Sequence, residues 1–174
     1  MVFTVEQRCW MWLCFVCLFF VVRLVRVGFS NKLRKMLVSG HIGIWYDPST
    51  NLTWMRCSLG QTWDGTTCIG TAQKYTWEEA QQAVAEMNRN GGYAGYTDWM
   101  VPDTKALQSL LRKHKHVPKI DHTIFPNTPG SFYWSASPNA GINDNAWLVN
   151  FGDGGTHYGN KYSSGYVRAV RAGQ

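Results

Sequence analysis

Polar and aromatic side chains interrupt the apolar segments in the last third of the chain, and these residues are well suited to bind a ligand. Asn, Ser and Gly supply adaptable hydrogen bonds, and Tyr supplies flat contact area at low entropic cost. Residues of these types lie between the expected strand positions, so the pattern predicts a recognition surface. Its members are Asn143, Asp144, Asn145, Asp153, His157, Tyr158, Asn160 and Tyr162, with Asn139 and Ser163 beside them.

The same loops hold oxygen atoms that suit a calcium ion. Asp144 and Asp153 lie near Asn143, Asn150 and Asn160 in the sequence, and Ca²⁺ binds carboxylate and amide oxygens of this kind. However, Asn and Asp in glycine-rich turns more often serve the geometry of the turn. We therefore expect no cofactor and no metal ligands, and keep calcium as the alternative.

A basic segment follows in the middle of the chain. The simplest interpretation is a solvated helix end, where cations also suit the negative end of the helix dipole. The functional alternative is a patch that binds an anionic polymer. Zinc is a remote third, because no Cys or clear carboxylate partner accompanies the histidines. The segment contains the cations Arg112, Lys113, Lys115 and Lys119 and the histidines His114, His116 and His122.

Two cysteines enclose a polar loop of ten residues that shows neither helical nor strand periodicity. Cys57 and Cys68 at this spacing predict a disulfide, because a metal pair would usually sit closer and bring more Cys or His nearby. A disulfide that closes such a loop contributes a few kcal/mol, about 2–4. It also indicates an oxidising compartment, and hence an extracytoplasmic protein.

Short alternating segments separated by Gly, Asn, Asp and Ser predict an antiparallel β-meander over residues 133–171, ending in a closing strand at 166–171. Upstream, residues 44–46 and 52–55 predict two strands joined by a turn. We expect the large apolar side chains of the meander to form the core, and Arg168 and Arg171 to have structural roles. The expected core residues are Trp134, Trp147, Phe151, Val167 and Val170.

Two helices are expected between these β segments. Thr76 and Glu79 form a capping box that begins a helix from Trp77 to about Asn88, and two glycines at 91–92 end it. Its apolar stripe consists of Trp77, Ala80, Val84 and Met87.

A second helix is expected to start at Asp103 as N-cap, directly after Pro102. Its apolar face consists of Leu107, Leu110 and Leu111, and it is expected to fade within residues 112–116. Pro118 forbids its continuation.

The first 39 residues differ from the rest in composition. Residues 9–22 form an apolar run of fourteen residues, which is short for a membrane span but suits a signal-peptide core. No small-residue cleavage site follows, and basic residues lie after the run. We therefore predict a leader at residues 1–39, as a signal, a membrane anchor or a mis-assigned start, and one domain at residues 40–174.

The net charge of +6 arises mostly from this leader. It holds six Lys and Arg against one acid, whereas residues 40–174 hold eleven against ten. The domain is thus nearly neutral, which argues against nucleic-acid binding. Nine Trp, eight Tyr and eight Phe favour a β-rich domain with an aromatic core.

Seven stretches in order resemble the bacterial family named for the C-terminal domain of the Legionella collagen-like adhesin Lcl, over about residues 41–174. They are Trp54–Trp63, Tyr75–Ala80, Gly91–Trp99, Ile120–Asp121, Phe125–Pro126, Tyr133–Ser135 and Tyr166–Arg171. The resemblance implies an α+β, C-type-lectin-like fold related to the formylglycine-generating and sulfatase-modifying group, with two helices packed on a twisted antiparallel sheet and long loops. Where the family usually reads Trp-Arg-Leu-Pro this chain has Met100 and Val101 in the middle positions, and Ala106 replaces a Glu.

The resemblance makes a sulfated glycan a plausible ligand for the basic segment. It does not carry over formylglycine chemistry, which needs a reactive cysteine pair in the C-terminal half, because no cysteine follows Cys68. We therefore expect a non-enzymatic, extracytoplasmic domain that binds a glycan or a protein surface through its C-terminal loops. The alternatives are a retroelement-diversified receptor for protein ligands, a structural or oligomeric assembly module and, less favoured, an enzyme of the formylglycine-generating type.

Overall fold

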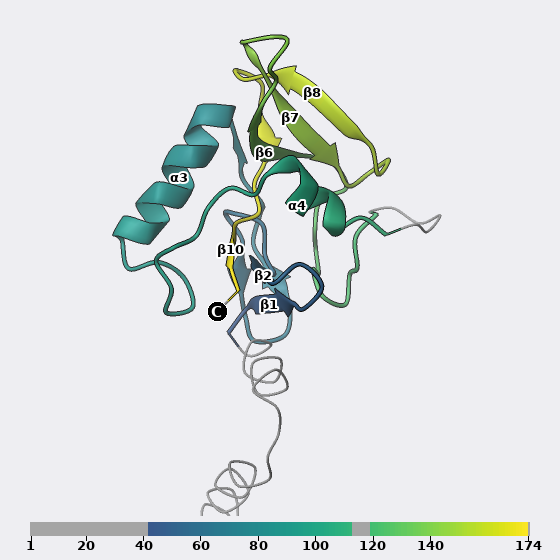
Figure 1. The fold of residues 1–174 in the computed structure, drawn as a ribbon. Coiled ribbons are helices and arrows are strands. Elements are labelled where there is room, and N and C mark those ends of the chain that lie inside the picture. Colours follow the sequence, from purple (N-terminus) through teal and green to yellow (C-terminus); the bar gives the residue numbers. More distant parts are fainter. Residues whose placement is uncertain (1–41, 113–118, 174) are drawn as a thin grey trace, which may run out of the picture. The chain divides into compact units, whose positions relative to one another are not determined.

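A computed structural model describes residues 42–112 and 119–173, which form an α+β fold of two helices and three small β-sheets (Figure 1). The predicted leader at residues 1–39 lies outside the described residues. Among those that are described, neither helix has the length and apolar character needed to cross a membrane.

The first sheet has three antiparallel strands and brings the two ends of the domain together. Its order is β1 (Ile44–Asp47), β2 (Leu52–Met55) and β10 (Val170–Ala172). The predicted strand pair at 44–46 and 52–55 is confirmed. Its turn is built by Asp47, whose carboxylate accepts hydrogen bonds from Ser49 and Thr50.

The largest sheet has five strands and occupies the opposite end of the domain from β1 and β2 (Figure 1). Its order is β5 (Lys74–Tyr75), β9 (Gly165–Tyr166), β6 (Phe132–Pro138), β7 (Asn145–Asn150) and β8 (Thr156–Asn160). The β6–β7–β8 meander is confirmed. The prediction of a wholly antiparallel sheet is wrong, because β9 runs parallel to β6 with Tyr133 opposite Tyr166.

The predicted closing strand at 166–171 is in fact shared between two sheets. Its first residue, Tyr166, lies in β9, and its last two, Val170 and Arg171, lie in β10 beside β2. Between them the chain remains extended, and the Leu59 and Met55 amides donate to the carbonyls of Val167 and Ala169. This segment therefore ties the two sheets to one another.

A third, two-stranded sheet lies inside the loop that the cysteines enclose. It pairs β3 (Thr62–Trp63) with β4 (Cys68–Ile69), although the sequence of this loop shows no strand periodicity. Asp64 builds the turn by accepting hydrogen bonds from Thr66 and Thr67. A strand of two residues is too short to produce an alternating pattern.

Helix α3 (Trp77–Arg89) has the predicted boundaries to within a residue. The capping box is present, since the Glu79 amide donates to the Thr76 hydroxyl and the Thr76 amide donates to the Glu79 carboxylate. At the other end Gly92 adopts a φ of +74°, and an added Cβ would lie 1.9 Å from the Tyr96 carbonyl oxygen. Glycine is thus required where the chain leaves this helix.

Helix α4 (Thr104–Ser109) starts as predicted and ends earlier than predicted. The Asp103 side chain accepts a hydrogen bond from the Ala106 amide at 2.7 Å, which confirms the N-cap. The helix does not continue through residues 110–112, and the Arg112 amide donates to the Lys119 carbonyl while the Lys119 amide donates to the Phe151 carbonyl. These backbone hydrogen bonds to residues farther along the chain take the place of a further helical turn.

Two apolar clusters form the core, one beneath each helix. The stripe of α3 packs on Trp134 and Leu148, and Leu107 of α4 and its C-cap residue Leu110 pack on Tyr133, Val149 and Phe151. The core prediction is confirmed for Trp134, Phe151, Val167 and Val170, which are at most 2% exposed. It is wrong for Trp147, which is only partly buried and lies at the surface beside α4.

Arg171 anchors the 93–98 loop to β10, as expected for a structural residue. Its Nε and NH2 groups donate to the two oxygens of Asp98 at 2.7 and 2.9 Å, and its guanidinium lies 3.9 Å from the centroid of the Tyr96 ring. These hydrogen bonds lower the pKa of the Asp98 carboxyl from its ordinary value.

We expect the contribution of the Arg171–Asp98 ion pair to the free energy of unfolding to disappear in acid. Because the folded-state pKa of Asp98 is lowered, the stabilisation is present above the unfolded pKa of about 3.9 and is lost as the pH falls through the folded value. Asp98 is 55% exposed, so solvent screening limits the effect to under about 1 kcal/mol. Urea unfolding of the parent and Asp98→Asn proteins between about pH 6 and about pH 2.5 should show a stability difference that shrinks with acidity. A difference that stayed constant would contradict the assignment.

Candidate functional site

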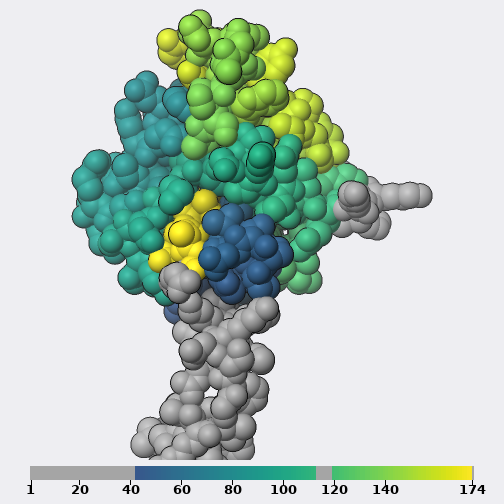
Figure 2. Space-filling model, viewed as in Figure 1, coloured from purple at the N-terminus to yellow at the C-terminus, as the bar shows by residue number. Residues whose placement is uncertain are grey.

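An open groove of about 620 Å³ runs between α4 and strands β6, β7 and β8 of the five-stranded sheet. In the space-filling view the surface of α4 lies beside that of the β7–β8 hairpin (Figure 2). Side chains from both sides line it, and most of them are polar. They are Asp103, Thr104, Lys105 and Gln108 from the helix and its cap, Ser137 and Pro138 from β6, Trp147 from β7 and Thr156 from β8.

A β-bulge in β6 shapes the wall of this groove. The register of β6 against β7 shifts between Trp134 and Pro138. Within the bulge the buried Ser135 hydroxyl donates to the Trp147 carbonyl at 2.8 Å and accepts from the Ser137 amide at 3.2 Å. Bulges of this kind redirect side chains and end strand pairing. Here the bulge fixes the backbone of Trp147 directly beside α4.

Hydrogen bonds connect α4 to the sheet across the groove. The Gln108 amide nitrogen donates to the Thr156 hydroxyl at 2.7 Å, and the Thr104 hydroxyl lies 3.0 Å from the Ser135 hydroxyl. On β8, Tyr158 stands opposite Trp147 in the strand register. Their rings pack edge to face with centroids 5.8 Å apart, and Tyr158 is 55% exposed. The Tyr158 ring therefore restricts the position of the Trp147 indole.

The structure divides the predicted ligand-binding loops into two groups, at opposite ends of β7 and β8. The first group lies in two adjacent loops, residues 139–145 and 160–163, which we call the apex. The Lys161 amide donates to the Asp144 carbonyl, and the Lys161 ammonium to the Asn143 carbonyl at 2.6 Å. The apex brings together Asn139, Asn143, Asp144, Asn145, Asn160, Tyr162 and Ser163.

The second group lies at the β7–β8 turn. Asp153 accepts hydrogen bonds from the Gly155 amide at 2.6 Å and from the Asn150 amide group at 3.0 Å. His157 Nε2 lies 3.2 Å from the same carboxylate, and the imidazole packs edge to face on Phe132. Asp153 thus serves the geometry of the turn, while Tyr158 lies between the two groups, on the face that carries Trp147.

These positions separate the residues that were considered for calcium. Asn143, Asp144 and Asn160 belong to the apex, whereas Asn150 and Asp153 lie at the far end of β7, about 17 Å away for a strand of this length. The two sets therefore do not form one site. Within residues 42–112 and 119–173, no group of three or more His, Cys, Asp or Glu residues is arranged to hold a metal ion.

The basic segment is described only at its two ends. Arg112 is exposed and Lys119 is partly buried, and backbone hydrogen bonds link Arg112 to Lys119 and Lys119 to Phe151 beside the β7–β8 turn. His122 is exposed. The predicted residues Lys113, His114, Lys115 and His116 lie outside the described residues. Neither Arg112 nor Lys119 lines the groove beside α4.

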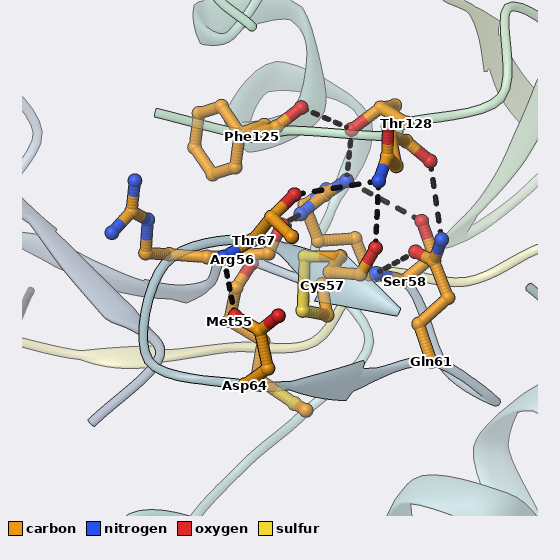
Figure 3. The surroundings of a disulfide bond; sticks show 12 residues. Met55, Arg56, Cys57, Ser58, Gln61, Asp64, Thr67, Phe125 and Thr128 are labelled. Carbon is orange, nitrogen blue, oxygen red and sulfur yellow. Dashed lines mark hydrogen bonds between the residues drawn. A yellow bond between two sulfur atoms is a disulfide. The ribbon is translucent and has the colours of Figure 1, made fainter. Parts of the chain in front are cut away.

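The predicted disulfide between Cys57 and Cys68 is present, with Cα atoms 5.4 Å apart and both residues buried (Figure 3). Beside it lies the fully buried Arg168, which donates to the carbonyls of Met55 and Arg56 and to the Thr128 hydroxyl at 2.7 Å. Burial lowers the pKa of this guanidinium. Arg168 and the disulfide together hold the loop around Ser58. These hydrogen bonds give Arg168 the structural role that the sequence predicted.

A comparison with models of protein families adds to this geometry. The family model described as the Lcl C-terminal domain matches residues 43–171. The chain belongs to this family. The resemblance noted in the sequence is thereby confirmed. A search of curated proteins finds no match.

The Lcl C-terminal domain match runs from β1 into β10, so the groove, the apex and the disulfide all lie within it. The two departures from the family pattern lie at different places. Met100 is 51% exposed, and its backbone exchanges two hydrogen bonds with Val170. Ala106 is partly buried against the core beneath α4. Neither position leaves a buried charge without a partner.

Sequence analysis of this Lcl C-terminal domain did not identify the groove. Trp147 lies in an apolar run, which favours a core position, and Asp103 was interpreted only as a helix cap. The available signal was the pair of serines at 135 and 137, which interrupts the otherwise mostly apolar strand β6.

Proposed function

We propose that this protein is a non-enzymatic, extracytoplasmic recognition domain with a C-type-lectin-like fold. It binds a glycan or a protein surface through the C-terminal half of the domain, where the groove and the apex lie. The disulfide supports an oxidising compartment. Membership of the Lcl C-terminal domain family supports the assignment to a recognition module.

The observation that carries the proposal is the chemistry along the groove and its rim. A partly buried Trp147 and an exposed Tyr158 lie beside amide and hydroxyl groups of Gln108, Thr104 and Ser137. Binding sites combine aromatic surface with a few fixed polar groups in this way.

The apex provides a second surface for the same function. Tyr162 is 81% exposed and Ile142 is 45% exposed, and amide side chains surround them. Exposed tyrosine next to Asn and Ser is typical of surfaces that recognise proteins. The apex therefore suits a protein ligand, whereas the groove suits a smaller hydroxylated one.

Binding of the full-length chain to an array of glycans, sulfated polymers and surface proteins tests the proposal. An apex variant with Ile142→Ser and Tyr162→Ser, and a groove variant with Trp147→Ala, locate any binding. We expect one of them to lose binding by about tenfold or more, as for a hot-spot residue. An array on which the parent protein binds nothing would refute the proposal. Equal binding by the parent and both variants would refute the assignment of the binding site to the apex or the groove.

The basic segment is the second candidate site. Lys119 and Arg112 lie together through backbone hydrogen bonds, at the end of the domain that also carries His157. A variant with alanine at Arg112, Lys113, Lys115 and Lys119 tests this site. Loss of binding to a sulfated polymer in this variant, together with weakening as salt rises to about 0.5 M, would assign the ligand to the basic segment.

A further inference from the structure

The groove beside α4 has almost no net charge, and this restricts its ligand. Its lining contains one carboxylate, Asp103, and one ammonium, Lys105. Asp103 is already engaged as the helix cap. A sulfated or carboxylated ligand requires several cations or bidentate arginines, and the lining has no arginine. The groove therefore favours an uncharged ligand.

The neutral polar groups of the groove combine donors with acceptors. Gln108 donates one N–H to Thr156 and retains its carbonyl oxygen and its second N–H. The Ser137 hydroxyl accepts from the Thr104 amide at 3.2 Å and retains its own proton to donate. A ligand rich in hydroxyl groups, each both donor and acceptor, matches this set.

Trp147 supplies an apolar surface next to these groups. The negative face of an indole ring attracts the weakly positive C–H groups on one side of a sugar ring. The edge-to-face contact with Tyr158 limits the positions that the indole can adopt, and the Ser135 hydrogen bond to the Trp147 carbonyl fixes the backbone that carries it. A preorganised ring loses little entropy on binding.

We propose that the groove binds one uncharged pyranose ring of a glycan, with the ring stacked on Trp147 and its hydroxyls hydrogen bonded by Gln108 and Ser137. The inference rests on the proposed recognition function and names the ligand class of one site within it. The volume of about 620 Å³ lies within the range of small-ligand sites, about 300–1,000 Å³.

Saturation-transfer NMR with the full-length chain tests the inference directly. The probes are the methyl glycosides of glucose, galactose, mannose, N-acetylglucosamine and N-acetylgalactosamine, and heparin serves as the anionic comparison. We expect transfer to at least one methyl glycoside, weakened about tenfold or more in Trp147→Ala and unchanged by salt. Gln108→Ala should also weaken it, and this exposed position is tolerant to substitution.

Controls separate the inference from folding defects and from the broader function. Ile69→Ala removes an exposed apolar side chain that belongs neither to the groove lining nor to the apex, and it should leave the transfer unchanged. Trp147→Phe keeps a ring in place and should retain part of the signal. Array binding without transfer to any methyl glycoside, or transfer that survives Trp147→Ala and Gln108→Ala, would overturn the inference and leave the recognition function standing. Failure of both assays would overturn both.

Discussion

Replacing Arg168 with methionine is expected to lower the free energy of unfolding by about 3–5 kcal/mol. The guanidinium is fully buried and donates to the backbone carbonyls of Met55 and Arg56 and to Thr128. Methionine fills similar space but leaves these acceptors without donors, at about 1–3 kcal/mol each. It also removes the contact with the Phe125 ring, whose centroid lies 4.7 Å from the Arg168 Cζ atom.

An apolar replacement does not recover this loss. Removing a buried charge can be neutral when its charged partner is removed with it. The hydrogen-bond partners of Arg168 in the described structure are the backbone carbonyls of Met55 and Arg56 and the hydroxyls of Ser58 and Thr128, all of them uncharged. These acceptors remain in place after the substitution but have lost their donor. The Arg168→Met substitution is therefore expected to lower the free energy of unfolding.

Urea unfolding of the parent and Arg168→Met proteins measures the loss. Arg112→Met is the matched control, because Arg112 is exposed and should change stability by under about 0.5 kcal/mol. Arg168→Lys keeps a positive charge without the planar fork and should fall between the parent and Arg168→Met. Equal stability of the parent and Arg168→Met would show that the buried hydrogen bonds contribute nothing net.

Local chemistry made part of this fold predictable. The capping box at Thr76, the cap at Asp103 and the turn at residues 47–51 each depend on side chains that contact backbone groups within three residues. Such contacts form in the same way whatever surrounds them. The disulfide was predictable for a similar reason, since the two cysteines lie only eleven positions apart.

Pairing between distant strands accounts for the errors. The closing strand divides between two sheets because Val170 pairs with Trp54 and Gly165 pairs with Tyr75, partners that no local pattern identifies. Helix α4 stops short because Arg112 finds a partner in Lys119. Tertiary contacts of this kind override local propensity.

The candidate site depends on the same long-range pairing. The residues expected for recognition do lie in loops and at strand ends. However, the register of β7 against β8 places Asn145 and Asp153 at opposite ends of these two strands. The bulge in β6 places Trp147 at the surface beside α4. Residue spacing in the sequence predicts neither the β7–β8 register nor the bulge in β6. A shift of one residue in strand pairing would move every side chain of the strand to the opposite face of the sheet.

Removing the Cys57–Cys68 disulfide is expected to lower the free energy of unfolding by about 3 kcal/mol. The bond closes a loop with a sequence separation of eleven, and its loss restores that freedom to the unfolded chain. Both cysteines are 1% exposed, so alanine is a better replacement than serine, which would bury a hydroxyl. Urea unfolding of the Cys57→Ala, Cys68→Ala protein against the parent measures the effect.

Reductant provides the matched control for this prediction. The parent unfolded and refolded in dithiothreitol should lose about the same 3 kcal/mol, while the double variant should not respond. Cys9, Cys14 and Cys17 remain in both proteins, so any response of the double variant reports on those thiols and is subtracted. Equal unfolding of the parent and the double variant would contradict the prediction.

Because Arg168 holds the Ser58 end of the same loop, the destabilising effects of its substitution and of the loss of the disulfide should not be additive. A triple variant that loses less than the sum would show that the arginine and the disulfide constrain one structural unit.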